Sequence, residues 1–89
     1  MRVKIELYAT LREKFKRKEI EVDAADLREA LQTAAESLGS EFLEEIFDND
    51  ELRRDRIIIV NGEIIRDIER LSSLRNAERI AIFPPLVGG

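Results

Sequence analysis

The residues best suited to chemistry are the last two of the sequence, Gly88 and Gly89. Glycine has no Cβ, so a chain that ends in two glycines can enter a narrow channel and leaves its terminal carboxyl group open to attack. Shortly before these glycines, Pro84 and Pro85 follow Phe83. Because neither proline can donate to a β ladder, we expect them to end a strand and to extend the chain away from the domain as a semi-rigid spacer. The pattern predicts chemistry at the Gly89 carboxyl group.

A terminal Gly-Gly pair alone is weak evidence, because it arises by chance about once in 200 sequences. Its place behind a strand and two prolines makes it informative. Leu86 and Val87 complete the tail, which the prolines set apart from the rest of the sequence.

The composition removes most chemistry that depends on side chains. The sequence contains no cysteine and no histidine, so it lacks disulfides, thiolate metal sites and cysteine nucleophiles, together with the usual zinc ligands and general bases. Asp48, Asp50 and Glu51 could suggest a calcium loop, but the glycine and the distal glutamate of an EF-hand are missing. We expect a solvated acidic loop there, and no metal or cofactor bound by this chain.

The charge pattern argues against nucleic acid as a partner. The net charge is −4, whereas binding to a phosphate backbone requires a basic face. The cluster Lys14-Phe15-Lys16-Arg17-Lys18 could meet an acidic partner or a phosphate, but this pattern favours a solvated hairpin loop.

Length and hydropathy predict one small soluble domain. A chain of 89 residues buries too little surface for a deep catalytic cleft. Its longest apolar runs, at 57–60 and 80–87, are far shorter than the roughly 20 residues of a membrane span. The alternating pattern begins directly after Arg2, unlike a signal peptide. We expect a cytoplasmic protein with a domain at 1–83 and a projecting tail at 84–89.

Hydrophobic periodicity predicts the elements of the domain. Residues 3–7 and 19–22 alternate between apolar and polar, and each segment is expected to form a strand. Residues 78–83 are expected to form the last strand, with Ile80 and Ile82 on one face and Ala81 and Phe83 on the other. The first two strands would form a hairpin with a long charged loop. Asp26 is a good N-cap with Glu29 three residues later, and the helical spacing that follows ends at Gly39.

The second half of the domain is expected to be mostly strand. A short helical piece is predicted from Ser40 to Asp48, before the apolar run 57–60, which predicts a central strand. Asn61-Gly62 predicts a tight hairpin into a strand at 63–65. Leu71 and Leu74 are expected in a loose loop. The predicted order is ββαβββ, an α+β fold.

One face of the predicted sheet carries more apolar residues than a solvated face should. The strand parities place Tyr8, Ile58, Val60, Ala81 and Phe83 opposite the helix, with Ile64 close to them across the hairpin. Either a short helix or loop covers this face, or it is a docking patch for a partner beside the tail.

The ending Ile80-Ala81-Ile82-Phe83-Pro84-Pro85-Leu86-Val87-Gly88-Gly89 resembles that of the MoaD family, the small subunits of molybdopterin synthase. The segment Tyr8-Ala9-Thr10-Leu11-Arg12-Glu13 and the hairpin Val60-Asn61-Gly62 are similar to that family at the corresponding places. The resemblance implies a ubiquitin-like β-grasp fold, a mixed sheet of four or five strands with one main helix across one face. That fold agrees with the order predicted from periodicity.

The resemblance also implies a function. Members of this family are sulfur carriers: an adenylating enzyme of the MoeB type, related to the ubiquitin-activating enzyme, uses ATP and magnesium to activate the terminal glycine, and sulfur then replaces the adenylate. By this resemblance Gly89 would carry the thiocarboxylate and Gly88 would give clearance. A MoaE-type large subunit would bind the tail, with Tyr8, Ile64 and Phe83 among the docking residues. The chain would not be an enzyme alone.

The sequence leaves other functions open. A ubiquitin-like modifier joined through Gly89 to lysines of target proteins would begin with the same acyl adenylate, and one chain could do both. A thiazole-pathway carrier similar to ThiS shares the Gly-Gly ending but lacks the Phe-Pro-Pro approach. A plain interaction module with an inert tail is the third alternative.

Overall fold

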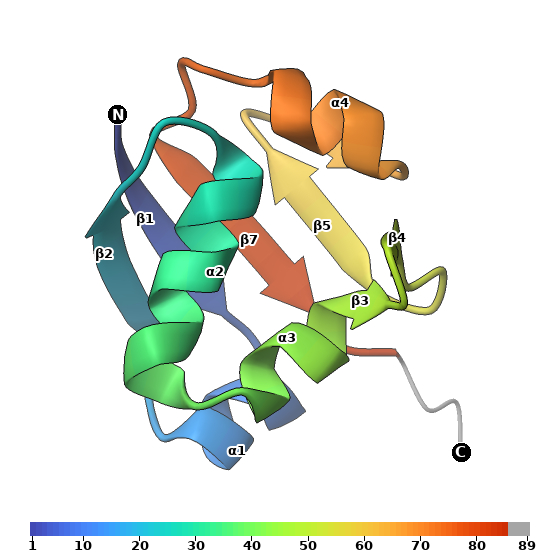
Figure 1. Ribbon diagram of the computed structural model, residues 1–89. Helices are drawn as coiled ribbons and strands as arrows, with labels where there is room; N and C mark the ends of the chain where they lie inside the picture. Colours follow the sequence, from blue (N-terminus) through green and yellow to red (C-terminus); the bar gives the residue numbers. More distant parts are fainter. Residues whose placement is uncertain (86–89) are drawn as a thin grey trace.

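The computed structural model describes residues 1–85, and over these residues the protein is built around a five-stranded mixed sheet and a small separate hairpin. The strands of the large sheet lie in the order β2-β1-β7-β5-β6 (Figure 1). In chain order they are β1 (Arg2–Leu7), β2 (Glu19–Asp23), β5 (Ile57–Val60), β6 (Glu63–Ile65) and β7 (Arg79–Phe83). With helix α2 (Leu27–Leu38) between β2 and β5, they give the predicted ββαβββ order.

Strand β7 occupies the middle of the sheet. It pairs in parallel with β1, where Leu7 lies beside Ile82, and antiparallel with β5, where Ile58 lies beside Ile82. β2 pairs antiparallel with β1, and β6 with β5. The first and last strands are therefore neighbours, as in the β-grasp fold. Strand β5, expected to be central, lies next to the centre.

Helix α2 crosses one face of this sheet, as Figure 1 shows. Its first turn is capped by Asp26, whose Oδ1 accepts a hydrogen bond from the Glu29 N–H at 2.9 Å, and at its end the Gly39 N–H donates to the Ala35 carbonyl. Both predicted signals are confirmed. With 12 residues α2 is the longest helix within residues 1–85, where no helix is long and apolar enough to cross a membrane.

The core lies between the sheet and α2. One face of each strand supplies buried aliphatic side chains, and α2 supplies Leu27, Ala30, Leu31 and Ala34 opposite them. Helix α3 (Glu41–Ile46) closes one side with Phe42 and Ile46, both fully buried. Removing this apolar surface from water stabilises the fold by roughly 25 cal/mol per Å².

Two segments expected as loops contain short helices. Helix α1 (Thr10–Phe15) stands in the predicted charged loop, and α4 (Ile68–Ser73) in the predicted loose one. Each is held by one buried leucine, Leu11 and Leu71 respectively. Asp67 also caps α4, accepting from the Arg70 N–H at 2.8 Å. Helices of one or two turns depend on such tertiary contacts rather than on their own propensity.

The helical piece expected from Ser40 to Asp48 ends earlier. After α3, Phe47 enters strand β3 (Phe47–Asp48), which pairs antiparallel with β4 (Glu51–Leu52). Asn49 adopts a left-handed conformation, with φ 61°, at the turn. Asparagine tolerates this region better than most residues, and the resulting hairpin buries Leu52.

Candidate functional site

The aromatic pair Tyr8 and Phe83 lies at the end of β7 from which the tail departs. The two rings are stacked, with centroids 4.5 Å apart and an interplanar angle of 12°. The parallel pairing of β1 and β7 sets this contact, because Tyr8 directly follows β1 and its N–H donates to the Ile82 carbonyl at 3.2 Å. A stacked pair of this kind contributes about 0.5–1.5 kcal/mol beyond its buried area.

Polar contacts orient the tyrosine. Its hydroxyl donates to Glu6 Oε1 at 3.3 Å. The Arg12 guanidinium lies over its ring, 5.4 Å from the centroid, and Arg12 Nε donates to the Leu7 carbonyl at 3.1 Å. The N-terminal part of α1 thus fixes the ring that supports the end of β7.

Isoleucines extend this aromatic pair across the sheet. Ile57 pairs with Phe83, and Ile59 pairs with both Ala81 and Ile64. Ile57 is 40% exposed and Ile64 is 48% exposed, and they are the exposed large hydrophobic residues within the described part of the chain. We name this surface the open-face patch; it consists of Tyr8, Ile57, Ile59, Ile64, Ala81 and Phe83.

The sequence prediction of this face needs one correction. Ile58 and Val60 were expected on it, but each is only 1% exposed and faces the core, because Ile58 pairs with the buried Ile82. Ile57 and Ile59 take their places. The predicted positions of Tyr8, Ala81, Phe83 and Ile64 on one face agree with the structure.

The sequence left two alternatives for this face, a covering helix or loop and a docking patch for a partner. A covering helix or loop would leave the patch buried, whereas Ile57 and Ile64 are exposed over residues 1–85. The described part of the chain therefore leaves this apolar surface accessible to a partner.

The tail begins differently from the sequence prediction. Pro84 is buried and Pro85 is half-buried, so the chain does not leave the domain directly after Phe83 as expected. The remaining predicted site residues lie outside the described residues: Leu86, Val87, Gly88 and Gly89.

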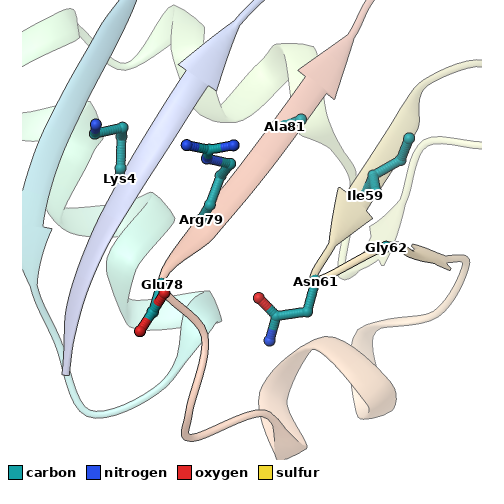
Figure 2. A pocket seen from close by; sticks show the side chains of 7 residues that line it. All are labelled: Lys4, Ile59, Asn61, Gly62, Glu78, Arg79 and Ala81. Atoms are coloured by element: carbon teal, nitrogen blue, oxygen red, sulfur yellow. The ribbon is translucent and has the colours of Figure 1, made fainter.

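A hollow of about 520 Å³ lies at the opposite end of the sheet face (Figure 2). It is bordered by Lys4, Asn61, Glu78 and Arg79, which come from β1, the β5–β6 turn and the start of β7. Figure 2 shows these polar groups around Ile59 and Ala81. Since β7 runs from this hollow toward Phe83, the hollow is remote from the start of the tail.

No cluster of acidic side chains suited to a metal ion occurs within residues 1–85. Asp48 and Glu51 face each other in the β3–β4 hairpin, and Asp50 lies in its turn. All three are exposed, as the prediction of a solvated acidic loop requires.

Three functional candidates were missed in the sequence: Ile57, Ile59 and Arg12. The hairpin could have supplied the parity of the isoleucines, because a two-residue Asn61-Gly62 turn places residue 59 opposite 64. Nothing comparable in the sequence indicates that Arg12 lies over Tyr8.

Comparison with known proteins identifies relatives. A family model described as the ThiS family matches residues 5–89. Among solved structures, SAMP1 from Haloferax volcanii superposes with a TM-score of 0.79 and 25% sequence identity over 100% of both chains. The small archaeal modifier protein 1 (SAMP1) from Methanosarcina acetivorans has a TM-score of 0.75 and 27% identity, covering 99% of this chain and 96% of that one.

A putative molybdopterin converting factor, subunit 1, from Pyrococcus furiosus is similar over 97% of this chain and 99% of its own, with a TM-score of 0.66. At 22% identity this likeness concerns the fold. A search of curated proteins gave no match. The family match covers nearly the whole chain, and the neighbours share its ubiquitin-like β-grasp architecture. The chain belongs to the ThiS family, whose fold is that of ubiquitin-like sulfur carriers and modifiers.

Proposed function

We propose that this chain is a sulfur carrier whose Gly89 carboxyl group is converted to a thiocarboxylate. The observation that carries the proposal is the place of the Gly-Gly ending. The family match extends through residue 89, and the tail continues the strand whose last residue, Phe83, belongs to the exposed open-face patch. A partner that docks on the patch would have the tail beside it.

The carboxylate must first be activated, because it is a poor electrophile until one oxygen becomes part of a good leaving group. In the proposed reaction a Gly89 carboxylate oxygen attacks the α-phosphate of ATP and pyrophosphate leaves. A sulfur nucleophile then attacks the carbonyl carbon and AMP leaves with the oxygen. ATP and magnesium belong to a MoeB-type adenylating enzyme, and this chain supplies only the carboxyl group.

We propose molybdopterin synthesis as the destination of the sulfur. The resemblance of the Phe83-Pro84-Pro85 approach and of the segment after β1 to the MoaD family supports this assignment. A MoaE-type large subunit would then receive the tail, with Tyr8, Ile64 and Phe83 in the contact. Because Gly88 and Gly89 carry no side chains, this end of the tail fits a narrow channel that leads to the acceptor's active site.

Intact-mass measurement tests the first step. After incubation with ATP, magnesium, an adenylating enzyme and a sulfur donor, the mass should show one oxygen exchanged for sulfur. The variant that lacks Gly89 should show no exchange while keeping the circular dichroism spectrum of the parent. Failure of the parent under conditions that convert a known carrier would contradict the proposal.

A second candidate is a protein modifier attached through Gly89 to lysines. The similarity to two small archaeal modifier proteins at 25% and 27% identity favours it. The two functions share the adenylate and differ in the acceptor. Peptide mapping of cell extracts distinguishes them: lysines branched with the tail support conjugation, and their absence beside abundant thiocarboxylate excludes it.

The acceptor distinguishes molybdopterin synthesis from the thiazole pathway. Purified thiocarboxylate should yield product with a molybdopterin synthase large subunit and none with thiazole synthase; the reverse result would assign the chain to the thiazole pathway. If the tail is inert, neither acceptor yields product, and replacing Gly88 by a bulky residue changes nothing.

A further inference from the structure

A groove of about 480 Å³ lies at the outer side of β5 and β6. Four arginines and two exposed isoleucines line it: Arg53, Arg54, Arg56, Arg66, Ile57 and Ile64. We name it the arginine groove. Because Ile57 pairs with Phe83, the groove starts one strand away from the end of β7. It is thus continuous with the open-face patch on the side of the edge strand β6.

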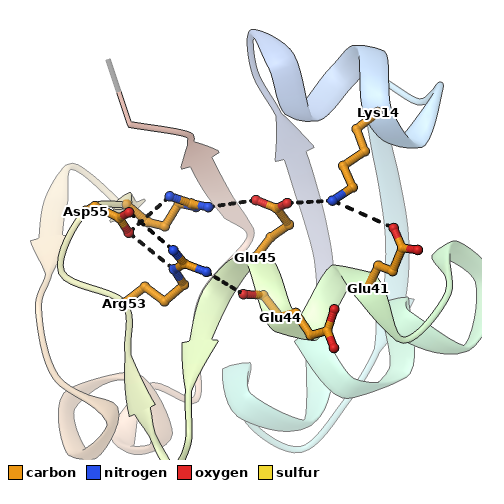
Figure 3. Close-up of polar contacts among 7 residues, drawn as sticks. Lys14, Glu41, Glu44, Glu45, Arg53 and Asp55 are labelled. Atoms are coloured by element: carbon orange, nitrogen blue, oxygen red, sulfur yellow. Dashed lines mark hydrogen bonds and ion pairs between the residues drawn. The ribbon is translucent and has the colours of Figure 1, made fainter. Parts of the chain in front are cut away.

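Two of the four arginines are already neutralised. Arg53 holds Asp55 with contacts of 3.3 Å, and Arg56 Nη2 donates to Glu45 at 2.8 Å. Asp55 Oδ1 also lies 3.0 Å from Arg56 Nη1, and Figure 3 shows Asp55 joined to Arg53 by dashed lines. The hydrogen bond from Arg53 lowers the pKa of Asp55, so this carboxylate stays ionised and engaged.

Of the other acidic residues near the groove, Glu63 and Asp67 are engaged. Glu63 receives two hydrogen bonds of 2.7 Å from Arg70, which lower its pKa. Asp67 caps α4. Asp48 and Glu51 border a neighbouring hollow with Arg54 but form no ion pair with it.

Arg54 and Arg66 therefore remain as uncompensated charges. Both are exposed, and neither has an ion-pair or hydrogen-bond partner within residues 1–85. They stand on a protein with a net charge of −4. Asp48 and Glu51 border the neighbouring hollow and do not line the groove, so the charged groups of the groove that are free to pair are these two guanidinium groups. Exposed apolar surface rimmed by uncompensated charge is typical of an interaction site.

We propose that the arginine groove binds a short acidic and apolar segment of a partner protein. Carboxylates of that segment pair with Arg54 and Arg66, whose planar guanidinium groups suit bidentate contacts, and an apolar side chain covers Ile57 and Ile64. Two free cations are too few for a nucleic-acid backbone, and the isoleucine floor matches a peptide rather than a free phosphate. The inference concerns binding by the domain and stands whether or not Gly89 reacts.

An NMR titration of the full chain tests the groove. The probe is a synthetic peptide in which aspartate and glutamate alternate with leucine and isoleucine, and its control carries lysine at the acidic positions. We expect shifts of the amide signals of Arg54, Ile57, Ile64 and Arg66 with the acidic peptide and none with the basic one.

Charge reversal gives the matched comparison. The double variant Arg54→Glu/Arg66→Glu should weaken binding at least about tenfold, a loss on the order of 1.4 kcal/mol or more. Arg17→Glu reverses an exposed arginine remote from the groove and should change affinity less than about twofold. Because the three positions are exposed, the amide spectra should report intact folding for each variant.

Four outcomes would overturn the proposal: shifts confined to other surfaces, equal binding of the basic peptide, an unchanged affinity in the double variant, or an equal loss in Arg17→Glu. Groove signals that move with protein concentration alone would assign the groove to a second copy. Groove signals that move on deletion of residues 86–89, with peptide affinity rising, would assign it to the chain's own tail. Either assignment replaces the proposed partner.

Discussion

Arg56 and Glu45 form an ion pair in which Arg56 Nη2 lies 2.8 Å from Glu45 Oε2, and their side chains are only 7% and 17% exposed. Glu45 Oε1 also accepts from Lys14 Nζ at 2.8 Å. Figure 3 shows Glu45 between the two cations. One carboxylate of α3 thereby links α1 to the segment that precedes β5, which carries the wall of the arginine groove.

Replacing Glu45 by glutamine should destabilise the domain by about 1–2 kcal/mol, because it leaves the Arg56 charge poorly compensated. Arg56 Nε and Nη1 are buried and make no hydrogen bond, although Nη1 lies 3.0 Å from Asp55 Oδ1 as an ion-pair contact. Urea unfolding followed by circular dichroism measures the loss. Glu41→Gln, which removes an exposed 3.7 Å contact to Lys14, should cost less than about 0.5 kcal/mol; an equal loss would contradict the role of burial.

The contribution of Glu45 should depend on pH. Burial by itself raises the pKa of Glu45, but hydrogen bonds from Lys14 and Arg56 outweigh burial and hold it below the ordinary value of 4.5. A lowered carboxyl pKa stabilises the folded state above the unfolded value, and this stability is lost as pH falls through the folded value. The difference in unfolding free energy between the parent and Glu45→Gln should therefore shrink from about pH 7 to about pH 3. A difference that is constant over this range would refute the linkage.

Tyr8 should contribute to function through its aromatic ring, which stacks on Phe83, and not through its hydroxyl group. Tyr8→Phe keeps the stack on Phe83 and should preserve both stability and thiocarboxylate formation. Tyr8→Ala should cost about 0.5–1.5 kcal/mol of stability beyond its buried area and slow the conversion of Gly89 about tenfold. Unfolding curves and intact-mass time courses of the two variants measure both effects. Equal rates for all three proteins would remove Tyr8 from the docking surface.

The β5–β6 turn should be sensitive to the backbone alone. Gly62 has φ +84°, and a Cβ added there would meet no atom within 4 Å. Gly62→Ala should therefore destabilise by about 1 kcal/mol through strain without a clash. Asn61→Gly, where φ is 50°, should stay within about 0.5 kcal/mol of the parent. The urea unfolding midpoints of the two variants provide the test. A midpoint of Gly62→Ala equal to that of the parent would show that the turn relaxes to accommodate alanine.

The sequence carries enough information for the elements that alternate or cap themselves. β1 and β2 have one apolar and one polar face, β7 carries Ile80 and Ile82 on alternate positions, and Asp26 and Gly39 mark the ends of α2. Strand β5 has no such contrast. Its four residues are all apolar, so the pairing of β5 with its neighbours β6 and β7 decides that Ile58 turns inward and Ile57 outward.

The short helices were unpredictable for a different reason. α1 and α4 each have six residues, too few for intrinsic stability, and they form because Leu11 and Leu71 reach the core. The residues of the candidate site also fall into a predictable and an unpredictable group. Tyr8, Ile64 and Phe83 could be placed together from strand parity, whereas Arg12, Arg54 and Arg66 gain their roles from contacts that only the folded chain reveals.

The parallel pairing of β1 with β7 has a consequence during protein synthesis. The ribosome makes β1 first and β7 last, and until β7 emerges β1 and β5 both lack their shared neighbour. Pairing between strands so distant in sequence is slow compared with local hairpins. A nascent copy that stops before residue 79 lacks Ile80 and Ile82, and with them the buried side chains of the middle strand. Closure of the sheet therefore waits for β7, the strand that joins β1 to β5.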